Sequence, residues 1–548
     1  MNKLFIFGLS LLCFAIYFNS LNNDFILDDY ALVVNNPLIK SAKSLGQIFK
    51  ISPYDAAVMD RDISYDKMYR PLQLLSYSID YKIWGLNPSG FRLTNILLHL
   101  INSILIYYLF SLIFNVNIAK IISLFFAVHP LNTSVVVYIA GRADLLASFF
   151  MLFSIILFFR FIQSKKKIYY LLSFVSAAFA LLSRENALLL SGFIFLFLFF
   201  LKARPKEFFF VIPFIILNVS YICLRVILFG GQGMVLHPSF MPLPLRFLNF
   251  FNIVPRYLLL LLLPLDLHLF RVTPFIGQII GLKSGLSAGF IFLYLFLIIK
   301  FRNNRLLFFS MLWFLFWLIP VFFYLDGYSI LGQAMMAENW LYLSSAGFFA
   351  GFVFIRKAFK NLGKALIISA AIFYGFLTTV NNSLWKNGLV FYRNILEYTS
   401  KGNPLRKNLI KEYLNRGLYE DALAEIKKFS LDFPGSEDLY IFQGNYYYET
   451  GRINAAIENY GKALRKNKNL YAYYDLSLCY EKLGQLDKAV YFATEAVKMK
   501  PHYLAALVQL GDLYSQKKEF NQAERYYRAA LEIEPGNKIV QDKIKNAK

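Results

Sequence analysis

The chain has 548 residues, of which 57% are hydrophobic and 17% are charged, whereas an ordinary soluble domain has roughly 45–50% apolar and about 25% charged residues. This composition excludes a soluble globular enzyme. The formal net charge is +23, but residues 401–548 hold 24 basic and 19 acidic side chains, which leaves 33 basic and 15 acidic ones for residues 1–400. We therefore expect a lipid-embedded domain over 1–400 and a water-soluble domain over 401–548.

Apolar runs of about 20 residues, the length that crosses the hydrocarbon core, recur along the first domain. The sequence predicts eleven spans, near residues 3–21, 91–114, 118–138, 145–163, 168–182, 187–201, 208–228, 283–300, 306–324, 340–355 and 363–380. The first span lacks a small-residue cleavage site, so we expect an uncleaved anchor. A further apolar run near 247–264 is expected to lie in the interface or to re-enter, because another crossing would put the basic cluster at 300–305 outside.

Clusters of lysine and arginine predict the orientation of the spans, because such loops stay cytoplasmic. With the N-terminus inside, the clusters at 165–167, 202–206, 300–305 and 356–364 all fall in the cytoplasm. A large first loop over residues 22–90 and the domain over 401–548 then lie on the external side of the cell (inner) membrane. All carboxylates of the membrane domain except Glu207 fall on that external side too.

Two kinds of site are not supported. The basic residues do not form the aromatic-interleaved soluble patches of nucleic-acid-binding proteins, so no nucleic-acid partner is predicted. The three cysteines, Cys13, Cys223 and Cys479, are far apart and show neither a disulfide framework nor zinc-ligand spacing.

The second domain contains an internal repeat. Ala422, Ala456, Ala489 and Ala523 recur at intervals of 34, 33 and 34 residues, each with a tyrosine nine positions earlier. This is the tetratricopeptide pattern, and it predicts an α-solenoid of four repeats over 403–436, 437–469, 470–503 and 504–537. Residues 538–548 are expected to form a solvated end. Such arrays present a concave surface to extended peptides.

An acidic pair, Asp28 and Asp29, follows the first span at the predicted outer edge of the membrane. Neighbouring carboxylates repel each other and are partly desolvated, which raises a pKa and suits a general base or a cation ligand. A solvated turn is the simpler alternative. Further carboxylates stand at span ends, where desolvated charges are costly and often functional: Asp144, Glu185 and Glu338.

Four short runs occur in a fixed order: Phe25-Ile26-Leu27-Asp28-Asp29-Tyr30, Gly141-Arg142-Ala143-Asp144, Ser183-Arg184-Glu185-Asn186 and Ala337-Glu338-Asn339-Trp340. Together with the repeats, they resemble the transmembrane and tetratricopeptide-containing O-mannosyltransferase family and its prokaryotic relatives, which are similar to the protein O-mannosyltransferases of the GT-C class. The resemblance covers nearly the whole chain. Two positions depart from the family's pattern, Ser134 where many relatives carry Glu and Asn339 where they carry Arg.

The resemblance implies an all-α fold, with a polytopic GT-C membrane domain followed by the repeats. It also implies that mannose moves from a polyprenyl-phosphate carrier to Ser or Thr hydroxyls of exported proteins. In that family an acidic pair in the first external loop is catalytic, and Asp28 and Asp29 match it.

The chemistry of such a transfer predicts the roles of the charged residues. A hydroxyl acceptor needs a base, and the departing phosphate needs a positive partner. A carboxylate on the face opposite the leaving group gives inversion at the anomeric carbon, although the sequence does not assign the base between Asp28 and Asp29. Candidate donor-phosphate ligands are Arg70, Arg142 and Arg184, because guanidinium groups bind phosphate bidentately. Mg²⁺ or Mn²⁺ held by Asp28 or Asp29 stays open.

Each arginine also has a structural alternative. Arg70 can anchor its loop to lipid headgroups, Arg142 can be a surface cation beside a helix cap, and Arg184 can pair with Glu185. Further candidates for a supporting role at the site are Asp144, Glu185, Glu338, His99 and His129. Glu338 can instead interact with a helix dipole, and a hydrogen-bonded core position is the favoured interpretation of both histidines.

We therefore predict a membrane glycosyltransferase with an external active site, whose partners are the lipid carrier and an acceptor chain captured by the repeats. One alternative is transfer to a lipid-linked or surface glycan. Another is a non-catalytic membrane scaffold, in which the repeats recruit partner proteins.

Overall fold

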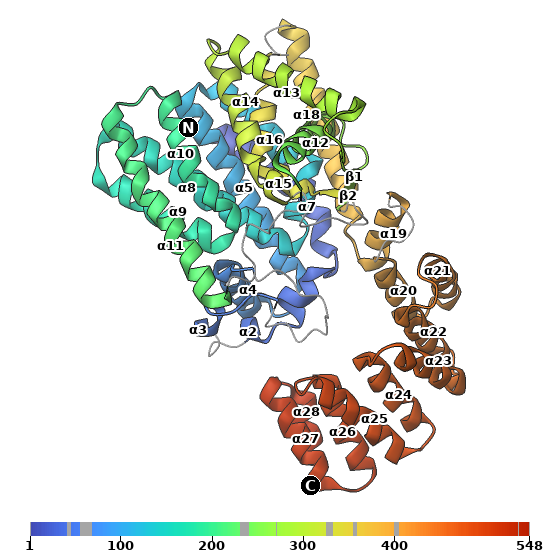
Figure 1. The fold of residues 1–548 in the computed structure, drawn as a ribbon. Coiled ribbons are helices and arrows are strands. Elements are labelled where there is room, and N and C mark those ends of the chain that lie inside the picture. Colours follow the sequence, from blue (N-terminus) through green and yellow to red (C-terminus); the bar gives the residue numbers. More distant parts are fainter. Residues whose placement is uncertain are drawn as a thin grey trace. The chain divides into compact units, whose positions relative to one another are not determined.

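A computed structural model describes residues 2–40, 45–54, 68–230, 241–269, 271–324, 333–354, 359–398, 405–534 and 536–546. It divides into two compact units, a membrane unit that ends at Asn387 and a repeat unit that begins at Gly388. The predicted domain boundary at residue 400 lies outside the described residues. The predicted all-α fold class is confirmed, with one short antiparallel ribbon added to the helices (Figure 1).

Eight helical segments of the described residues are long and apolar enough to cross a membrane. Their elements are α1 Lys3–Tyr17 with η1 Phe18–Asn22, α5 Pro88–Ile113, α8 Arg142–Ser164, η7 Pro205–Val211 with α11 Ile212–Phe229, α12 Leu243–Leu262, α13 Leu282–Lys300, α14 Arg305–Trp317 with α15 Ile319–Tyr324, and α18 Lys360–Ser383. A ninth candidate is bent by 52° between α6 Val116–Val128 and the segment of η4 Pro130–Asn132 and α7 Thr133–Val136. Two shorter apolar segments, α9 Lys167–Ser183 and η6 Glu185–Leu188 with α10 Leu189–Phe200, complete this set.

Two predicted spans differ from the helices that form. The predicted span at 340–355 begins with α16 Leu341–Phe349, a helix of nine residues, which is too short to cross the hydrocarbon core by itself. The run near 247–264, which was expected to lie in the interface or to re-enter, forms the continuous 20-residue helix α12, and this helix meets the same criteria of length and apolarity as the spans. The count of eleven crossings stays a prediction.

The lysine-rich turns gather at one end of the membrane unit. Arg305, at the start of α14, lies over the ring of Phe200 at the end of α10, with 5.1 Å from its guanidinium carbon to the ring centroid. Lys165, which follows α8, forms an ion pair with Glu207 in η7. Because α8 runs from Arg142 to Ser164 and α9 returns to Ser183, Arg142 and Arg184 lie at the opposite end of these helices.

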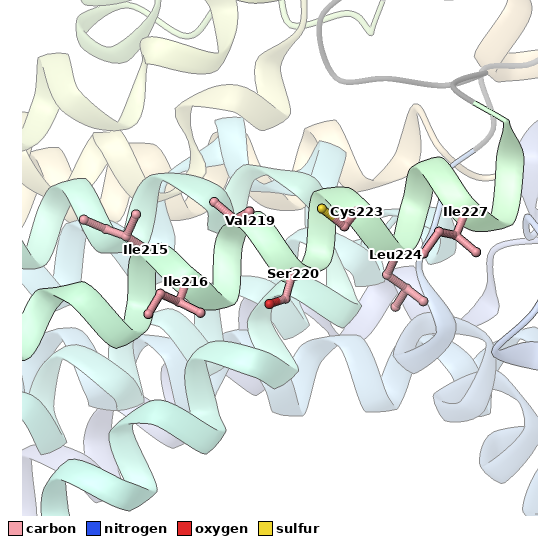
Figure 2. A pocket seen from close by; sticks show the side chains of 7 residues that line it. All are labelled: Ile215, Ile216, Val219, Ser220, Cys223, Leu224 and Ile227. Carbon is pink, nitrogen blue, oxygen red and sulfur yellow. The ribbon is translucent and has the colours of Figure 1, made fainter.

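The outward face of α11 carries a shallow apolar hollow of about 460 Å³. Figure 2 shows its side chains in a row along one face of the helix, with Ile215 and Ile216 near one end and Ile227 near the other. Ile216 and Ile227 are 59% and 79% exposed, as expected for a surface that contacts lipid chains.

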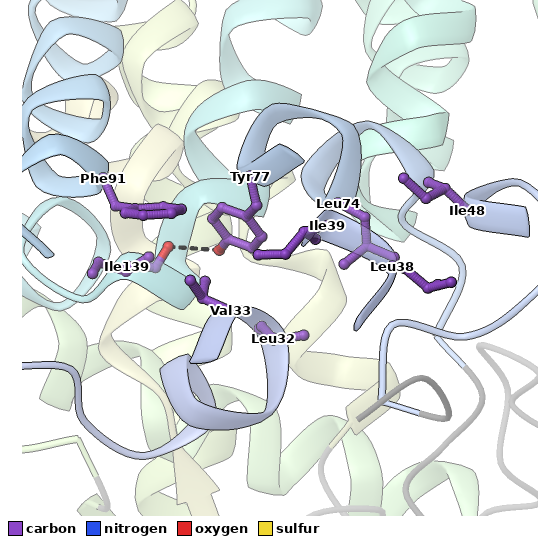
Figure 3. Close-up of a cluster of buried hydrophobic side chains, with 9 residues drawn as sticks. All are labelled: Leu32, Val33, Leu38, Ile39, Ile48, Leu74, Tyr77, Phe91 and Ile139. Carbon is purple, nitrogen blue, oxygen red and sulfur yellow. Dashed lines mark hydrogen bonds between the residues drawn. The ribbon is translucent and has the colours of Figure 1, made fainter. Parts of the chain in front are cut away.

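The predicted first loop folds into short elements, η2 Tyr30–Val34, α2 Pro37–Lys40, α3 Leu45–Ile48 and α4 Pro71–Trp84. Their apolar side chains pack into one cluster with Phe91 of α5 and Ile139 of η5 Ile139–Gly141 (Figure 3). The hydroxyl of Tyr77 donates a hydrogen bond of 2.8 Å to the carbonyl of Ile139. The cluster therefore fixes the acidic pair, which directly precedes η2, against the start of α8.

The short ribbon lies next to the Glu338 segment in the chain. It pairs β1 Arg271–Pro274 with β2 Gln333–Met336 in antiparallel register, with Arg271 opposite Met336. The strand β2 leads directly into η8 Glu338–Trp340 and α16.

The repeat unit consists of paired antiparallel helices, which confirms the predicted α-solenoid. After α19 Gly388–Tyr398, the elements are α20 Arg406–Asn415, α21 Tyr419–Asp432, α22 Glu437–Glu449, α23 Ile453–Lys466, α24 Leu470–Lys482, α25 Leu486–Met499, α26 Leu504–Gln516, α27 Phe520–Ile533 and α28 Lys538–Asn546. The predicted solvated end is instead the helix α28. It places Val540, which is 2% exposed, in a cluster with Tyr527 of α27, so it covers the apolar face of the last repeat.

Candidate active site

The carboxylate of Asp29 is completely buried and is held by backbone groups. Its Oδ2 accepts a hydrogen bond of 3.1 Å from the N–H of Ile26, and its Oδ1 accepts one of 2.9 Å from the N–H of Ala140. Burial raises the pKa of the Asp29 carboxyl to about 7, although Arg92 and the two backbone N–H groups act in the opposite direction. Asp29 therefore joins the acidic loop to the turn before α8.

Asp28 is half-buried and has different neighbours. Its Oδ2 accepts a hydrogen bond of 3.2 Å from the hydroxyl of Tyr54, and its backbone N–H donates one of 3.3 Å to the hydroxyl of Tyr138. Burial raises the pKa of the Tyr54 phenol well above its ordinary value, Asp28 adds to this effect, and Arg70 opposes it. Tyr54 therefore lies within electrostatic range of both the Asp28 carboxylate and the Arg70 guanidinium.

Arg92, which the motifs did not single out, holds the acidic loop in place. Its guanidinium donates to the carbonyls of Asn23 and Asp24, and its Nε donates to the carbonyl of Val137 at 3.1 Å. The same side chain thus binds the loop before Asp28 and the turn before α8. Because Arg92 lies one turn inside an apolar helix, this role had no signal in the sequence.

Arg142 is buried in a structural network rather than placed at an open surface. Its side chain is 0% exposed and forms an ion pair with Asp80, while its Nε donates to Asn95 Oδ1 at 2.7 Å. Its remaining groups donate to Ser76 Oγ and to the carbonyl of Phe91, and its guanidinium lies over the Tyr77 ring. The interpretation of Arg142 as a donor-phosphate ligand is therefore replaced by a structural one.

Arg70 and Arg184 form ion pairs that differ from the predicted pairing of Arg184 with Glu185. Arg70 donates from Nε and Nη2 to Glu185 Oε2, both at 3.1 Å, whereas Arg184 donates from Nη1 to Asp144 Oδ2. Each arginine side chain is 13% exposed. Arg70 Nη1 and Arg184 Nε and Nη2 have no hydrogen-bond partner among the residues that the structure describes, so these donors are available to a ligand.

Arg225 completes this group of charges and was missed in the sequence. It lies four residues before the end of α11, with its Nη1 3.9 Å from Glu185 Oε1 and its side chain 8% exposed. A single arginine near the end of an otherwise apolar run is the signal that could have identified it. We call Arg70, Arg184 and Arg225, with their carboxylates Asp144 and Glu185, the arginine cluster.

The arginine cluster and the hollow of Figure 2 lie on different faces of α11. Successive residues of an α-helix are rotated by about 100°, so Arg225 lies about 200° from both Cys223 and Ile227. Because Arg225 points inward and the hollow faces outward, the hollow is not part of the candidate site.

Glu338 and Asn339 point in different directions from the same short helix. Asn339 Nδ2 donates to Asp144 Oδ2 at 3.2 Å, so it joins the arginine cluster. Glu338 Oε1 instead accepts from the N–H of His268 at 2.8 Å and is 2% exposed, and burial raises the pKa of its carboxyl to about 8. Glu338 therefore binds the backbone at His268 and does not pair with an arginine of the arginine cluster.

His99, His129 and Ser134 are core residues, as the structural alternative predicted for the two histidines. His99 Nδ1 lies 2.8 Å from the Tyr342 hydroxyl and its Nε2 lies 3.1 Å from the Ala127 carbonyl. His129 Nε2 lies 3.0 Å from the Leu261 carbonyl, and its Nδ1 accepts from the N–H of Leu131. The Ser134 hydroxyl donates to the Leu131 carbonyl at 3.0 Å. All three side chains are buried.

The residues of the acidic pair do not fit a chelating metal site. Both carboxylate oxygens of Asp29 accept backbone hydrogen bonds, so only Asp28 of the pair presents a carboxylate toward the site. Among the described residues, no three His, Cys, Asp or Glu side chains are grouped as metal ligands would be.

Comparisons with known proteins find similarity in both units. Residues 71–229 match the family model of dolichyl-phosphate-mannose-protein mannosyltransferases. Residues 443–503 and 484–544 match two tetratricopeptide-repeat models. The first match contains Arg184 and Arg225 of the cluster and begins one residue after Arg70.

Curated relatives are named protein O-mannosyl-transferases. F38B6.6 from Caenorhabditis elegans is 28% identical over 427 residues, which cover 74% of this chain and 59% of the relative. TMTC4 from Mus musculus is 34% identical over 35% of this chain and 28% of its own length. TMTC3 from Homo sapiens is 23% identical over 95% of this chain and 63% of its own length. The chain thus spans less than two thirds of the length of these relatives. The predicted resemblance is confirmed.

Solved structures match the repeat unit. The crystal structure of MamA is 29% identical over 26% of this chain and 85% of that chain, with a TM-score of 0.23. YrrB, described as a TPR protein with an unusual peptide-binding site, is 21% identical over 28% of this chain and 81% of its own chain, with a TM-score of 0.24. The assignment of tetratricopeptide repeats rests on the family models and on the paired helices themselves.

Proposed function

We propose that this membrane protein, a relative of the TMTC O-mannosyltransferases, transfers a sugar from a polyprenyl-phosphate carrier to a hydroxyl group. The names of its relatives support mannose as the sugar and protein as the acceptor, and we propose Ser or Thr hydroxyls of exported proteins. The observation that carries the proposal is the juxtaposition of a half-buried carboxylate, Asp28, with arginines whose guanidinium groups retain donors for a phosphate.

Asp28 is the proposed general base. Asp29 has both oxygens engaged by backbone N–H groups, so a proton taken from an acceptor would break one of these bonds. The Asp28 carboxylate accepts from a phenol that lies within range of Arg70, so it faces the side where the donor phosphate would bind. Asp29 then acts as a positioning residue that anchors the loop.

The reaction needs few groups. Asp28 takes the proton of the acceptor hydroxyl while the hydroxyl oxygen forms a bond to the anomeric carbon of the sugar. The bond from that carbon to the phosphate oxygen breaks at the same time. The electron pair leaves with the polyprenyl phosphate, which Arg70 and Arg184 stabilise. No general acid is required, because the phosphate is already a weakly basic leaving group. A single displacement with the base opposite the phosphate inverts the anomeric centre.

The direction of the helices supports an external location for this site. The lysine-rich turns after α8, α10 and α13 lie at one end of the membrane unit, and such turns face the cytoplasm. Arg142, Arg184 and Arg225 stand at the other ends of α8, α9 and α11. We therefore propose that donor, acceptor and repeats meet on the extracytoplasmic side.

The repeat unit is the proposed acceptor-binding part. Tetratricopeptide arrays bind extended polypeptides on their concave face, and a tethered array raises the effective concentration of a bound chain near the active site. This role requires the repeats to be on the same side of the membrane as Asp28.

Transfer of radiolabelled sugar tests the proposal. Purified wild-type protein in lipid nanodiscs is incubated with labelled polyprenyl-phosphate mannose and extracted exported proteins, and we expect label in protein. Asp28→Asn should lower the rate by about 10²–10⁴-fold, the contribution that general base catalysis usually makes. Asp24→Asn is the matched control, because Asp24 is an exposed carboxylate of the same loop and should keep the wild-type rate.

The outcome also separates the alternatives. Label in a lipid-linked or surface glycan rather than in protein would replace the protein acceptor. Equal transfer by wild type and Asp28→Asn would reject Asp28 as the base. No transfer by any form, with partner proteins retained on the repeats, would favour the non-catalytic scaffold.

A further inference from the structure

Glu185 lies between two arginines of the arginine cluster. Its Oε2 accepts two hydrogen bonds from Arg70, and its Oε1 accepts from the N–H of Tyr69 at 3.3 Å and lies 3.9 Å from Arg225 Nη1. The carboxylate is 4% exposed. Planar guanidinium groups bind carboxylates and phosphates with the same bidentate geometry, so Glu185 competes with any anion for these donors.

Asp144 has the same relation to the third arginine. It forms an ion pair with Arg184 and accepts from Asn339. Arg70 and Arg184 still have unengaged donors among the described residues, so an anion can bind to them without displacing either acid. Bound there, a phosphate would lie close to two fixed negative charges and three positive ones.

The proposed reaction changes the charge of the ligand at this point. The donor is a phosphodiester with one negative charge. Its product is a phosphomonoester, which carries about 1.5 to 2 negative charges at pH 7 because its second pKa is about 6. A cluster of arginines alone would hold the product more tightly than the donor and would slow its release.

We propose that Glu185 and Asp144 tune the arginine cluster to a monoanionic phosphodiester and weaken its binding of the dianionic product. This inference rests on the proposed function, since it takes the lipid-linked phosphate as the ligand. Coulomb repulsion from a fixed carboxylate is proportional to the charge of the ligand. Each carboxylate therefore disfavours the monoester about twice as strongly as the diester, on a free-energy scale.

Binding measurements with a short-chain prenyl monophosphate and its methyl diester test this inference without any sugar transfer. Affinities of the full-length protein in nanodiscs are measured at pH 8, where the monoester is a dianion. Glu185→Gln should tighten monoester binding by about 10-fold and diester binding by about 3-fold, the magnitudes expected for one charge at about 8 Å and an effective dielectric constant of about 60. At pH 5, where the monoester also has a single charge, the two gains should become equal.

The controls distinguish charge tuning from support of the fold. Glu207→Gln removes a carboxylate that pairs with Lys165 at the other end of the helices, and it should change neither affinity. Asp144→Asn makes the same prediction as Glu185→Gln, so the test stands if one variant does not fold. A parallel loss of affinity for both ligands in folded Glu185→Gln and Asp144→Asn would overturn the inference and assign these acids to positioning alone.

Failure of this inference differs from failure of the proposed function. If neither prenyl ligand binds the wild type, the lipid-phosphate donor itself is contradicted. If both bind but the carboxylate variants do not shift their ratio, only the charge tuning is wrong.

Discussion

At the scale of single residues, Asp28 and Asp29 have the same chemistry and different surroundings. Asp29 is completely buried and receives two backbone hydrogen bonds, whereas Asp28 is half-buried and receives one from a tyrosine. Two adjacent residues of a turn point in different directions, so one carboxylate can fix the loop while the other faces the ligand. The motif reveals that both are present, but only the fold shows that their surroundings differ.

The buried Asp29 predicts a pH dependence of stability. Its carboxyl has a pKa of about 7 in the folded protein against an ordinary value of 3.8, so the folded state binds the proton more tightly. The stabilisation from this group is complete below about pH 4 and is lost as the pH rises to about 7. The melting temperature of wild type minus that of Asp29→Asn should fall over this interval and stay constant above it. A difference that does not change with pH, or that rises, would contradict this assignment.

The buried Arg142 predicts a stability defect rather than a binding defect. Arg142→Gln leaves Asp80, which is 4% exposed, without its cation, and removal of one partner of a buried ion pair costs about 3–5 kcal/mol. Thermal unfolding in detergent should show a clear loss, and Asp80→Asn in the same chain should restore part of it. If Arg142→Gln were stable but bound prenyl phosphate more weakly, Arg142 would be a phosphate ligand, as the sequence predicted.

The sequence therefore predicted the residue types of the site better than their partners. Asp28, Asp29, Arg70 and Arg184 were identified by their order along the chain. Which arginine a fold buries depends on contacts between distant segments, such as that of Arg142 with Asp80, and periodicity carries no information about these contacts. The partners of Arg92 and Arg225 could not be predicted for the same reason, since both side chains contact distant segments of the chain.

At the scale of elements, the repeats show how neighbouring helices approach each other. A Cβ atom at Gly444 would lie 2.4 Å from the Tyr460 ring, and one at Gly511 would lie 2.3 Å from the Tyr527 ring. The equivalent pair in the repeat between them is Ser477 and Ala493, two small residues that are both buried. A large side chain on the second helix thus requires glycine on the first.

This pairing predicts opposite effects for two glycine substitutions. Gly511→Ala forces the Tyr527 ring to move, and overpacking of this kind costs about 1–3 kcal/mol. Gly461→Ala, also inside a repeat helix, meets only the end of Arg465 at 3.8 Å, and it should stabilise by about 0.5–1 kcal/mol because alanine favours a helix over glycine. Thermal unfolding of the full chain, followed by tyrosine fluorescence, measures both. Equal effects would contradict the pairing.

Helices whose residues recur at a regular spacing were predicted well, and helices without such a pattern were not. The alanine spacing predicted the repeat helices, whereas α28 was expected to be solvated because Lys and Asn dominate its sequence. Two apolar residues of this helix, the buried Val540 and the partly buried Ile544, place it against α27. Within the predicted span at 340–355, the helix α16 ends at Phe349, and apolar composition alone does not show such an end.

At the scale of the whole molecule, the membrane unit is polarised along its helices. Basic turns lie at one end, and the acidic loop, the arginine cluster and the short helices of the first loop lie at the other. The sequence predicted this polarity because charge distribution alone sets it. The proposed sugar transfer to exported proteins requires the end with the acidic loop to face the outside.

Cysteine labelling in intact cells tests this polarity directly. Tyr30→Cys and Arg302→Cys place a thiol at two exposed positions, one beside the acidic pair and one in the basic turn after α13. Both are made in a chain that carries Cys223→Ser, because Cys223 is the exposed native cysteine of the described residues. A membrane-impermeant maleimide should label Tyr30→Cys in intact cells and Arg302→Cys only after permeabilisation, since the positive charges keep that turn inside. The reverse pattern would place Asp28 in the cytoplasm, where exported acceptors cannot reach it.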